Sequence, residues 1–427
     1  MAMSKLSPLL LGLLLAAAGS GARADDLLQA WNQARTADPQ LRQAAALSGA
    51  QEAAARVARA ALLPQWSVNA SEQRGDGHLH TATSSISQAL LDLPALREWQ
   101  ASRSEASAQE LRLDAAAQDA RARVAAAYFG LLSAQAQLAT AQANEQAFDR
   151  QVREAEVRFK TGLSAQVEAE QSRTYRELAR GSTLAAELAV SDAREALAEL
   201  TGAAPGALQP LVEAFAAQPL ADGVDAWVAR ALEANPVLRA LQQDVQASER
   251  RIAGARAGHL PTLSLGVDTT RQRGDGVSSL DASRTPTVVG LRLTVPLFAG
   301  GATSAATDRA VFQREAAREQ LEAARRALQR EVRAQYQAVA QGEARLRATQ
   351  AAVEAAQRSL DATGTGLTLG TRTITDLLLA IQTLGQAQNA RTDARHGHVL
   401  ALLALHRAAG SLDDQELQTV NALLEAR

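Results

Sequence analysis

The sequence predicts a mainly α-helical fold that contains a tandem duplication and four β-strands in each chain. The composition is 47% hydrophobic but only 3% aromatic, and Ala, Leu, Arg, Glu and Gln are abundant, which is typical of long packed helices. Two stretches of about 60 to 65 residues contain no proline. Short motifs also recur at a similar offset, 197 residues from Pro39 to Pro236 and 208 residues from Gly162 to Gly370. The offset indicates two structural repeats with loop insertions between them.

The overall charge and the absence of Cys exclude several classes of function. The formal net charge is -2 and the pI is near 6.4, which argues against nucleic acid as a partner. A chain without Cys forms no disulfides and no thiolate metal site. The sequence also lacks a phosphate-binding glycine loop, an HExxH string and a Ser-His-Asp spacing. We therefore expect no enzyme activity, no cofactor and no metal.

Residues 1–24 resemble a secretory signal peptide. Lys5 precedes an apolar run from Leu9 to Ala18, and Ala22-Arg23-Ala24 provides small residues for cleavage before Asp25. The alternative is a single membrane anchor, but the apolar run is too short to span a bilayer comfortably.

The first repeat is predicted to cover residues 25–202. A helical pattern runs from Asp26 to about Leu62, and two strand-like segments follow within about residues 63–91. After Pro94, about 65 residues form one helix that ends before Gly162. A helix of about 40 residues then ends at Gly202, and residues 203–223, which are rich in Pro and Gly, form a connector.

The second repeat is predicted to cover residues 224–410, with its strands at about residues 260–298. Apolar and polar residues alternate more clearly here, in Leu263–Thr269 and in Val289–Leu297. A helix of about 60 residues follows Gly300-Gly301, and a helix of about 40 residues ends at Gly410. Residues 411–427 form a C-terminal tail.

Two matching turns join the long helices in each repeat. Each turn begins with a glycine, Gly162 or Gly370, offers Ser or Thr as a helix N-cap, and places a carboxylate six residues later, Glu168 or Asp376. We expect these two turns to lie at one end of the molecule and the strands to lie at the other.

Four strands with one apolar face cannot close a barrel by themselves. Membrane barrels need about eight strands or more, and open strand edges in lipid leave backbone groups without partners. Oligomerisation solves this problem, and three chains would supply twelve strands. The residues alone do not determine that number.

The tandem repeat resembles the TolC family of outer-membrane channel-tunnels, as do the strand endings Gln88–Asp92 and Thr294–Gly301 and the turn Gly370–Asp376. The resemblance implies a homotrimer with a 12-stranded transmembrane barrel and a long α-helical tunnel through the periplasm. It implies a passive exit duct for type I secretion or multidrug efflux, with a periplasmic adaptor protein, an inner-membrane ABC or RND-type pump and outer-membrane lipid as partners. Residues 203–223 and 411–427 would form a belt around the tunnel.

The resemblance also implies a periplasmic gate. Arg372 would be its cation, Glu168 an acidic partner, and Asp376 would line the narrowest ring. Leu367 stands where well-known members have a tyrosine, and Leu379 where they have a second aspartate, so we expect a gate that depends more on Arg372 and apolar packing. Because one acidic ring replaces two, cation block should be weak. We also expect Arg372 and Asp376, four residues apart, to share a helix face.

The resemblance assigns adaptor docking to the turns themselves, and the residues concerned are Gly162, Leu163, Ser164, Gly370 and Thr371. The alternative for all these sites is ordinary: solvated charges on helix faces and common helix caps. The pairs His78/His80 and His396/His398 are poor candidates for a metal site. Two other classes of protein remain open, a periplasmic adaptor and a soluble helical coiled-coil scaffold, although neither accounts for the duplication, the strands and the signal peptide together.

Overall fold

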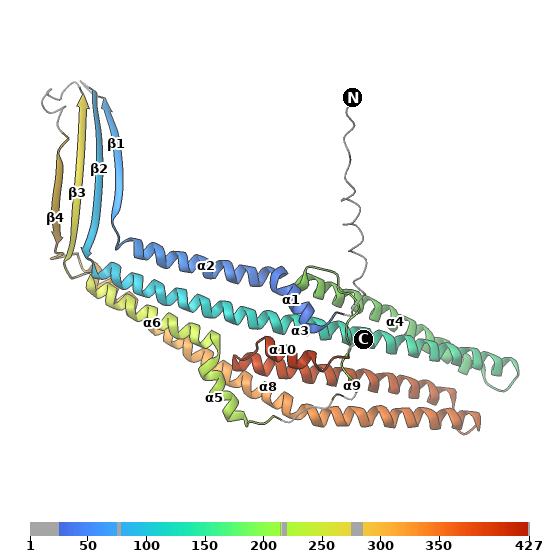
Figure 1. The fold of residues 1–427 in the computed structure, drawn as a ribbon. Helices are drawn as coiled ribbons and strands as arrows, with labels where there is room; N and C mark the ends of the chain where they lie inside the picture. Colours follow the sequence, from blue (N-terminus) through green and yellow to red (C-terminus); the bar gives the residue numbers. More distant parts are fainter. Residues whose placement is uncertain (1–24, 75–77, 214, 216–219, 275–284, 426–427) are drawn as a thin grey trace, which may run out of the picture.

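The protein is elongated, with a β-sheet at one end and two helical hairpin tips at the other (Figure 1). The computed structural model describes residues 25–74, 78–213, 215, 220–274 and 285–425. The predicted signal peptide, residues 1–24, lies outside the described residues. In the described part of the chain, no helix is long and apolar enough to cross a membrane.

Each repeat contains two short helices, one very long helix and one medium-length helix. The first repeat has α1 (Leu27–Ala37), α2 (Pro39–Ala60), α3 (Leu93–Lys160) and α4 (Gln166–Thr201). The second repeat has α5 (Val224–Ala234), α6 (Pro236–Ala257), α8 (Ala302–Thr368) and α9 (Ile374–Ala409), and α10 (Asp414–Asn421) follows.

The two long helices determine the length of the molecule. With 68 residues in α3 and 67 in α8, each is about 100 Å long. Helices α2 and α4 lie along successive parts of α3, and α6 and α9 lie along successive parts of α8 (Figure 1). The helix lengths predicted this arrangement, and the structure confirms it.

The first helical segment of each repeat is divided, which the sequence analysis did not predict. Asp38 adopts an extended conformation between α1 and α2, and its carboxylate accepts a hydrogen bond from the Gln40 backbone N–H (2.9 Å). Pro39 then begins α2, where its missing N–H costs nothing. The Asp38 side chain is almost fully buried, and its charge is balanced by the Arg123 guanidinium (2.6 Å). Asn235 ends α5 and caps α6 in the same way.

The four strands form one antiparallel sheet in the order β1-β2-β3-β4. Their bounds are Gln65–Arg74 for β1, His78–Leu91 for β2, Thr262–Gly274 for β3 and Thr287–Thr294 for β4. The last strand ends three residues earlier than predicted, at Thr294, because Pro296 has no backbone N–H to donate to a ladder. Leu297 and Phe298 lie beyond it, 92% and 90% exposed.

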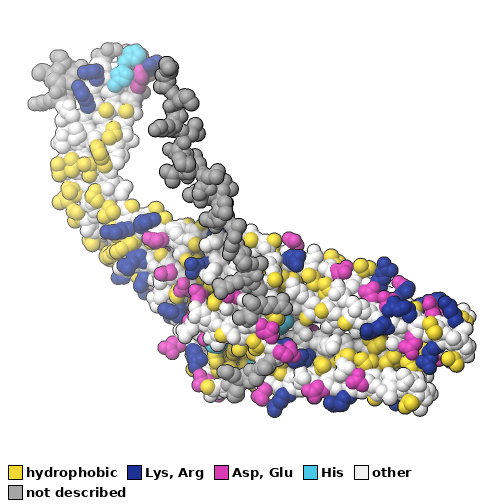
Figure 2. Space-filling model, turned by 45° about the vertical axis from the view of Figure 1, so that its right-hand side comes forward, with side chains coloured by type: hydrophobic (Ala, Val, Ile, Leu, Met, Phe, Trp, Pro, Cys, Tyr) yellow, Lys and Arg dark blue, Asp and Glu magenta, His cyan; other side chains and the backbone are white. Residues whose placement is uncertain are grey.

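The sheet has one apolar and one polar face. Directly paired residues in an antiparallel sheet lie on the same face, and the register places Trp66, Ile86, Val267 and Val289 in one row across all four strands. We call this side the apolar face, and it also carries Val68, Leu263, Leu265, Leu291 and Leu293. The other face carries mainly Ser, Asn, Gly, Asp268 and Arg292. Hydrophobic side chains gather on the half of the sheet nearest the helices (Figure 2).

The main hydrophobic core lies midway along the helices. Trp31, Tyr128 and Phe129 are buried there with residues from α4, α9 and α10. The segment after α4 and the C-terminal tail cross this core together, because Leu211 pairs with Leu424 and the Val212 N–H donates to the Leu423 carbonyl (2.9 Å). The Tyr128 hydroxyl also donates to the Gln209 carbonyl (2.9 Å). The segment after α4, and through it the C-terminal tail, is therefore fastened to the middle of α3.

Candidate functional site at the helix tips

The two long helices end in the same backbone motif. Gly162 follows α3 and Gly370 follows α8, and both have φ of +73°, in the left-handed region that glycine adopts without strain. In each case the next N–H donates to a carbonyl five residues earlier, Leu163 to Arg158 and Thr371 to Gly366, both at 2.8 Å. This is the Schellman arrangement that ends many helices. The two predicted glycine turns therefore have matching geometry.

The helices that leave the two turns begin differently. Thr373 caps α9 in a complete capping box: its Oγ1 accepts from the Asp376 N–H (3.2 Å), and the Asp376 carboxylate accepts from the Thr373 N–H (3.0 Å). Helix α4 begins after Ala165, which has no side-chain cap. The prediction that Ser164 caps α4 is wrong, because the helix starts one residue later. Ser164 Oγ is buried and has no hydrogen-bond partner among the described residues.

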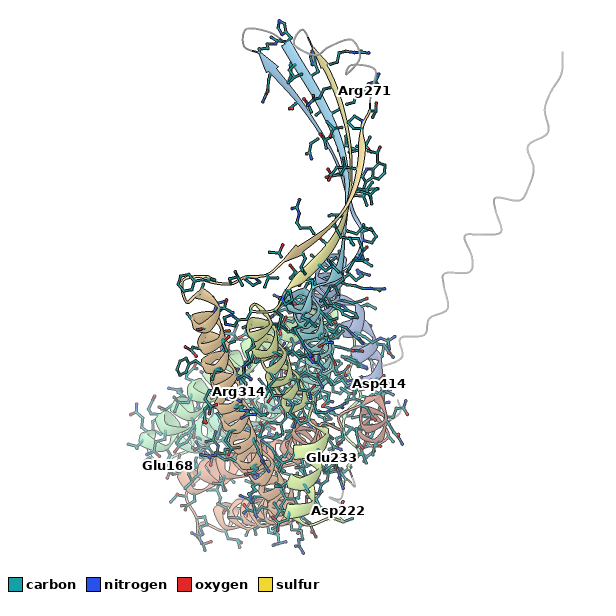
Figure 3. All side chains as sticks on the ribbon, turned by 90° about the vertical axis from the view of Figure 1, so that its left-hand side faces the viewer. Glu168, Asp222, Glu233, Arg271, Arg314 and Asp414 are labelled. Carbon is teal, nitrogen blue, oxygen red and sulfur yellow. The ribbon has the colours of Figure 1, made fainter. Side chains whose placement is uncertain are left out.

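Glu168 and Asp376 occupy equivalent positions, the third residue of α4 and of α9. Both carboxylates lie close to a helix N-terminus, where the backbone dipole favours negative charge. Hydrogen bonds from the Thr373 backbone and side chain lower the pKa of Asp376, and the nearby charge of Arg372 lowers it further. Asp376 is therefore ionised and held in the cap. Figure 3 looks from the sheet end toward the tips and labels Glu168 at the edge of the helical body.

Arg372 lies in the turn, two residues before α9 begins. The prediction that Arg372 and Asp376 share a helix face is therefore wrong, because only Asp376 is in the helix. Arg372 is exposed, and its side chain passes over Gly366, where an added Cβ would lie 2.6 Å from the Arg372 Cγ. No ion pair joins Arg372 to Glu168 within the part of this chain that the structure describes.

Leu367 and Leu379 have opposite environments. Leu367 is 6% exposed and packs in a cluster with Phe148, Ile374 and Leu378. Leu379 is 56% exposed on α9. A leucine at position 367 thus fills an apolar core just behind the turn, whereas Leu379 is open to solvent or to another chain.

Polar contacts join the two hairpins of the chain, and the sequence analysis did not identify them. The Thr375 hydroxyl donates to Gln171 Oε1 (2.8 Å), which links α9 to α4. On the first hairpin, Arg173 bridges Glu156 on α3 (2.7 Å) and Glu170 on α4 (2.8 Å). Hydrogen bonding to Arg173 lowers the pKa of Glu156. The only sequence signal was the closeness of these residues to the turns.

The outer surface of the tips is partly apolar. Leu163 is 75% exposed beside Gly162, and Val167 and Leu369 are 64% and 73% exposed. Gly370 and Thr371 are exposed as well, although the Thr371 hydroxyl donates back to the Gly366 carbonyl (3.1 Å). The tips therefore present apolar side chains on turns of matching geometry.

The two histidine pairs lie far from the tips. His78 and His80 are in β2, and His396 and His398 are buried in α9. His396 Nδ1 is hydrogen-bonded to the Ser133 hydroxyl (2.6 Å), and its ring packs against Phe129. Among the described residues, no group of three or more His, Cys, Asp or Glu could hold a metal ion.

The sequence and the fold of this chain match those of known proteins. The model of the outer membrane efflux protein family matches residues 30–203 and 227–411. The outer membrane protein TolC of Vibrio cholerae is 32% identical to this chain over 434 residues, and the match covers 99% of each protein. The alkaline protease secretion protein AprF of Pseudomonas aeruginosa is 29% identical, over 99% of this chain and 92% of that protein.

Solved structures share the fold. The CmeC outer membrane channel of Campylobacter jejuni has a TM-score of 0.82 at 17% identity, covering 100% of this chain and 98% of that one. The open MtrE channel of Neisseria gonorrhoeae has a TM-score of 0.78 at 21% identity, with coverage of 91% and 90%. Because the family model matches both repeats and full-length relatives match nearly every residue, the chain belongs to the outer membrane efflux protein family.

Proposed function

We propose that three copies of this chain form one closed duct, that a gate closes the duct at the helix tips, and that an adaptor protein opens it. Membership of the family makes the chain an outer-membrane exit duct for type I secretion or efflux that extends into the periplasm, and not an enzyme. The observation that carries the proposal is the pair of open edges along the whole length of the chain.

The open edges begin in the sheet. Within the described chain, β1 and β4 each pair on one side only. In lipid, an unpaired backbone group costs several kcal/mol, so an edge strand of eight or ten residues needs a partner. Pairing β1 of one copy with β4 of the next supplies that partner, and three copies give twelve strands.

The helices continue the same two edges. Helices α2 and α4 lie on one side of α3, and α8 lies at the other side of the molecule. Large apolar side chains remain exposed on these edge helices: Leu178, Leu184 and Leu188 on α4 are each at least 60% exposed, as are Val57 on α2 and Phe312 on α8, both at 73%. A neighbouring copy would bury them, at about 25 cal/mol for each Å² of apolar surface.

The proposed gate is inferred from a charged side chain that forms no ion pair within the described part of one chain. Arg372 is exposed and forms no ion pair within the described part of its own chain, although its charge lies near the capped Asp376 carboxylate, so Glu168 of a neighbouring copy is its proposed partner. Surface pairs of this kind contribute about 0.2–1 kcal/mol each, and three would hold the gate by a few kcal/mol at most. Asp376 would form the single acidic ring, with Leu379 nearby and Leu367 packed behind the turn. An adaptor that binds the open form more tightly would shift this balance.

The adaptor would dock on the exposed turns, namely Gly162, Leu163 and Ser164 of the first hairpin and Gly370 and Thr371 of the second. Leu163 is an exposed apolar side chain on the glycine turn, where a docking protein could bury it. An inner-membrane ABC or RND-type pump would supply the energy. Residues 203–223 and 411–427 would form the belt, which is supported by the pairing of Leu211 with Leu424.

The test is single-channel conductance of the purified protein in a planar bilayer. We expect long-lived openings of small conductance that become larger in Arg372→Ser, because the gate loses its cation. Arg56→Ser is the matched control, since Arg56 is a well-exposed arginine on α2 far from the tips. An unchanged conductance in Arg372→Ser would remove Arg372 from the gate, and a protein that forms oligomers but never inserts would contradict the duct.

A further inference from the structure

Basic side chains gather beyond the apolar face of the sheet, at the end farthest from the helices. The register places Arg273 beside His80 and Arg271 beside Ala82, on the same face as Trp66, and Arg74 pairs with His78. We call the set Arg74, His78, His80, Arg271 and Arg273 the distal basic rim. In Figure 2, Lys or Arg side chains (dark blue) and His side chains (cyan), with an acidic side chain (magenta) beside them, lie at the tip of the sheet past the hydrophobic band, and Figure 3 labels Arg271 there.

The position of the rim fits one boundary of a lipid bilayer. Eight residues separate Leu263, at the helix end of β3, from Arg271, and ten separate it from Arg273. These distances are about 26 and 33 Å along the strand, or about 20 and 25 Å of height if the strand is tilted by roughly 40°. The apolar band of outer-membrane barrels is about 25 Å tall. With the helices in the periplasm, the rim therefore lies at the level of the outer-leaflet headgroups.

The charges of the rim are only partly balanced. The Arg74 Nε donates to the Glu72 carboxylate (2.8 Å). Arg271 and Arg273 are exposed and have no ionic partner among the described residues. The two residues are two positions apart in β3, so both side chains leave the same face, about 7 Å apart along the strand. Each guanidinium can bind a phosphate with two parallel hydrogen bonds, so two arginines on one face suit a phosphate-bearing ligand.

We propose that the distal basic rim binds the phosphate groups of a phosphorylated glycolipid in the outer leaflet, with the lipid's acyl chains against the apolar face. The rim is continuous with the apolar face, so one amphiphile contacts both, and its cationic charge complements an anionic headgroup. Arg271 and Arg273 carry the binding, while the exposed His78 and His80 add hydrogen-bond donors. The inference rests on the proposed closed duct, which turns the apolar face toward lipid.

The experiment compares two lipids on the purified oligomer by native mass spectrometry: bisphosphorylated lipid A, and the same lipid with both phosphates removed. We expect the phosphorylated lipid to bind more tightly to the unmodified protein. Substituting Arg271→Gln and Arg273→Gln together should weaken its binding by about 25-fold, or about fivefold for each arginine. Arg292→Gln is the matched control, because Arg292 pairs with Ser264 on the polar face of the same sheet and should have no effect.

Two further measurements distinguish lipid binding from misfolding of the variant and from binding of any free anion. The pair Arg271→Lys and Arg273→Lys keeps the charge and should retain most of the binding, and added NaCl should weaken binding of the phosphorylated lipid to the unmodified protein. Equal binding of both lipids, equal losses in Arg292→Gln, or displacement by millimolar inorganic phosphate would each overturn the proposal. Normal conductance alongside such a result would leave the duct standing, whereas failure to insert would remove both.

Discussion

Gly366 leaves the space that the Arg372 side chain occupies. It lies in the last turn of α8, and a Cβ at this position would come 2.6 Å from the Arg372 Cγ and 3.2 Å from the Thr371 Oγ1. Because real Cβ contacts are not that short, a side chain at 366 must displace the arginine. A residue with no side chain therefore helps to set the direction of the proposed gate cation.

Gly366→Ala should change the gate and not the fold. Alanine favours the helix by about 1 kcal/mol over glycine, so the variant should fold, but Arg372 must move aside. We expect larger single-channel conductance than in the unmodified protein, in the direction of Arg372→Ser. Gly364→Ala is the control, since the nearest atom to its Cβ would be the Leu377 Cδ1, 4.0 Å away. If Gly366→Ala has the same conductance as the unmodified protein, the position of the Arg372 side chain does not control the gate.

Single residues were also where the sequence was least informative. Gly162 and Gly370 were predictable because a helix ends best on a left-handed glycine. Ser164 was not, because a cap depends on the residue at which the next helix starts, and a shift of one position removes it. The start of α9 likewise could not be predicted to the residue: it begins at Ile374, which leaves Arg372 in the turn. Its partner cannot be read from one chain if the contact joins two chains.

Helix α9 carries three of the six histidines of the chain, and burial disfavours the charged form of each of them. Burial lowers the pKa of His396 from 6.5 to about 4, and the charge of Arg395 adds to the effect. Burial also lowers the pKa of His398 and of His406. Protonation of these side chains in the folded protein is therefore unfavourable at the core of the helical body.

The helical body should lose stability as the pH falls from about 6.5 to about 4. In that range the unfolded chain binds a proton at His396 and the folded chain does not, which costs roughly 3 kcal/mol once the pH is below both pKa values. Thermal unfolding in detergent, followed by circular dichroism, measures the effect. His396→Gln should reduce the drop because glutamine does not titrate. An equal drop in that variant would assign the effect to other groups.

At the level of elements, the sequence predicted more than it did for residues. Long helices without proline and strands with alternating residues depend on local pattern, and both were found. The break between α1 and α2 at Asp38 was missed. A proline fits the first turn of a helix, so the presence of Pro39 did not by itself reveal that one helix ends and a second begins there. The links between hairpins, such as Thr375 to Gln171, involve residues 204 positions apart, and no local pattern predicts them.

At the level of the whole molecule, the sheet formed by the described residues is open, because β1 and β4 each pair on one side only. The strands carry apolar side chains on one face and polar ones on the other, which is the pattern of a barrel whose strands face lipid on one side and water on the other. Because of the duplication, each chain supplies two such pairs of strands. In the proposed duct, closure then depends on other copies.

Cysteine crosslinking should reveal the number of copies, because the chain has no Cys of its own. Asn69→Cys on β1 and Val288→Cys on β4, joined by a short bismaleimide, should give covalent products of two and three chains and none larger. Thr83→Cys with Thr270→Cys is the control: the two threonine hydroxyls are 3.4 Å apart on neighbouring strands of one chain, so this pair should crosslink only internally. Products of four or more chains would contradict a trimer.

The unequal helix starts at the two tips have a consequence for how such a ring deforms. In a ring of three copies there are six hairpins of nearly the same shape, but the helix that leaves every second turn lacks the side-chain cap that holds its neighbours. A cap typically stabilises a helix start by about 1 kcal/mol. The ring would thus have six hairpins of similar shape, but the stability of their helix starts would have only threefold symmetry. The three uncapped starts would deform more easily than the three capped ones, so a force applied from outside would distort each chain first at Ala165.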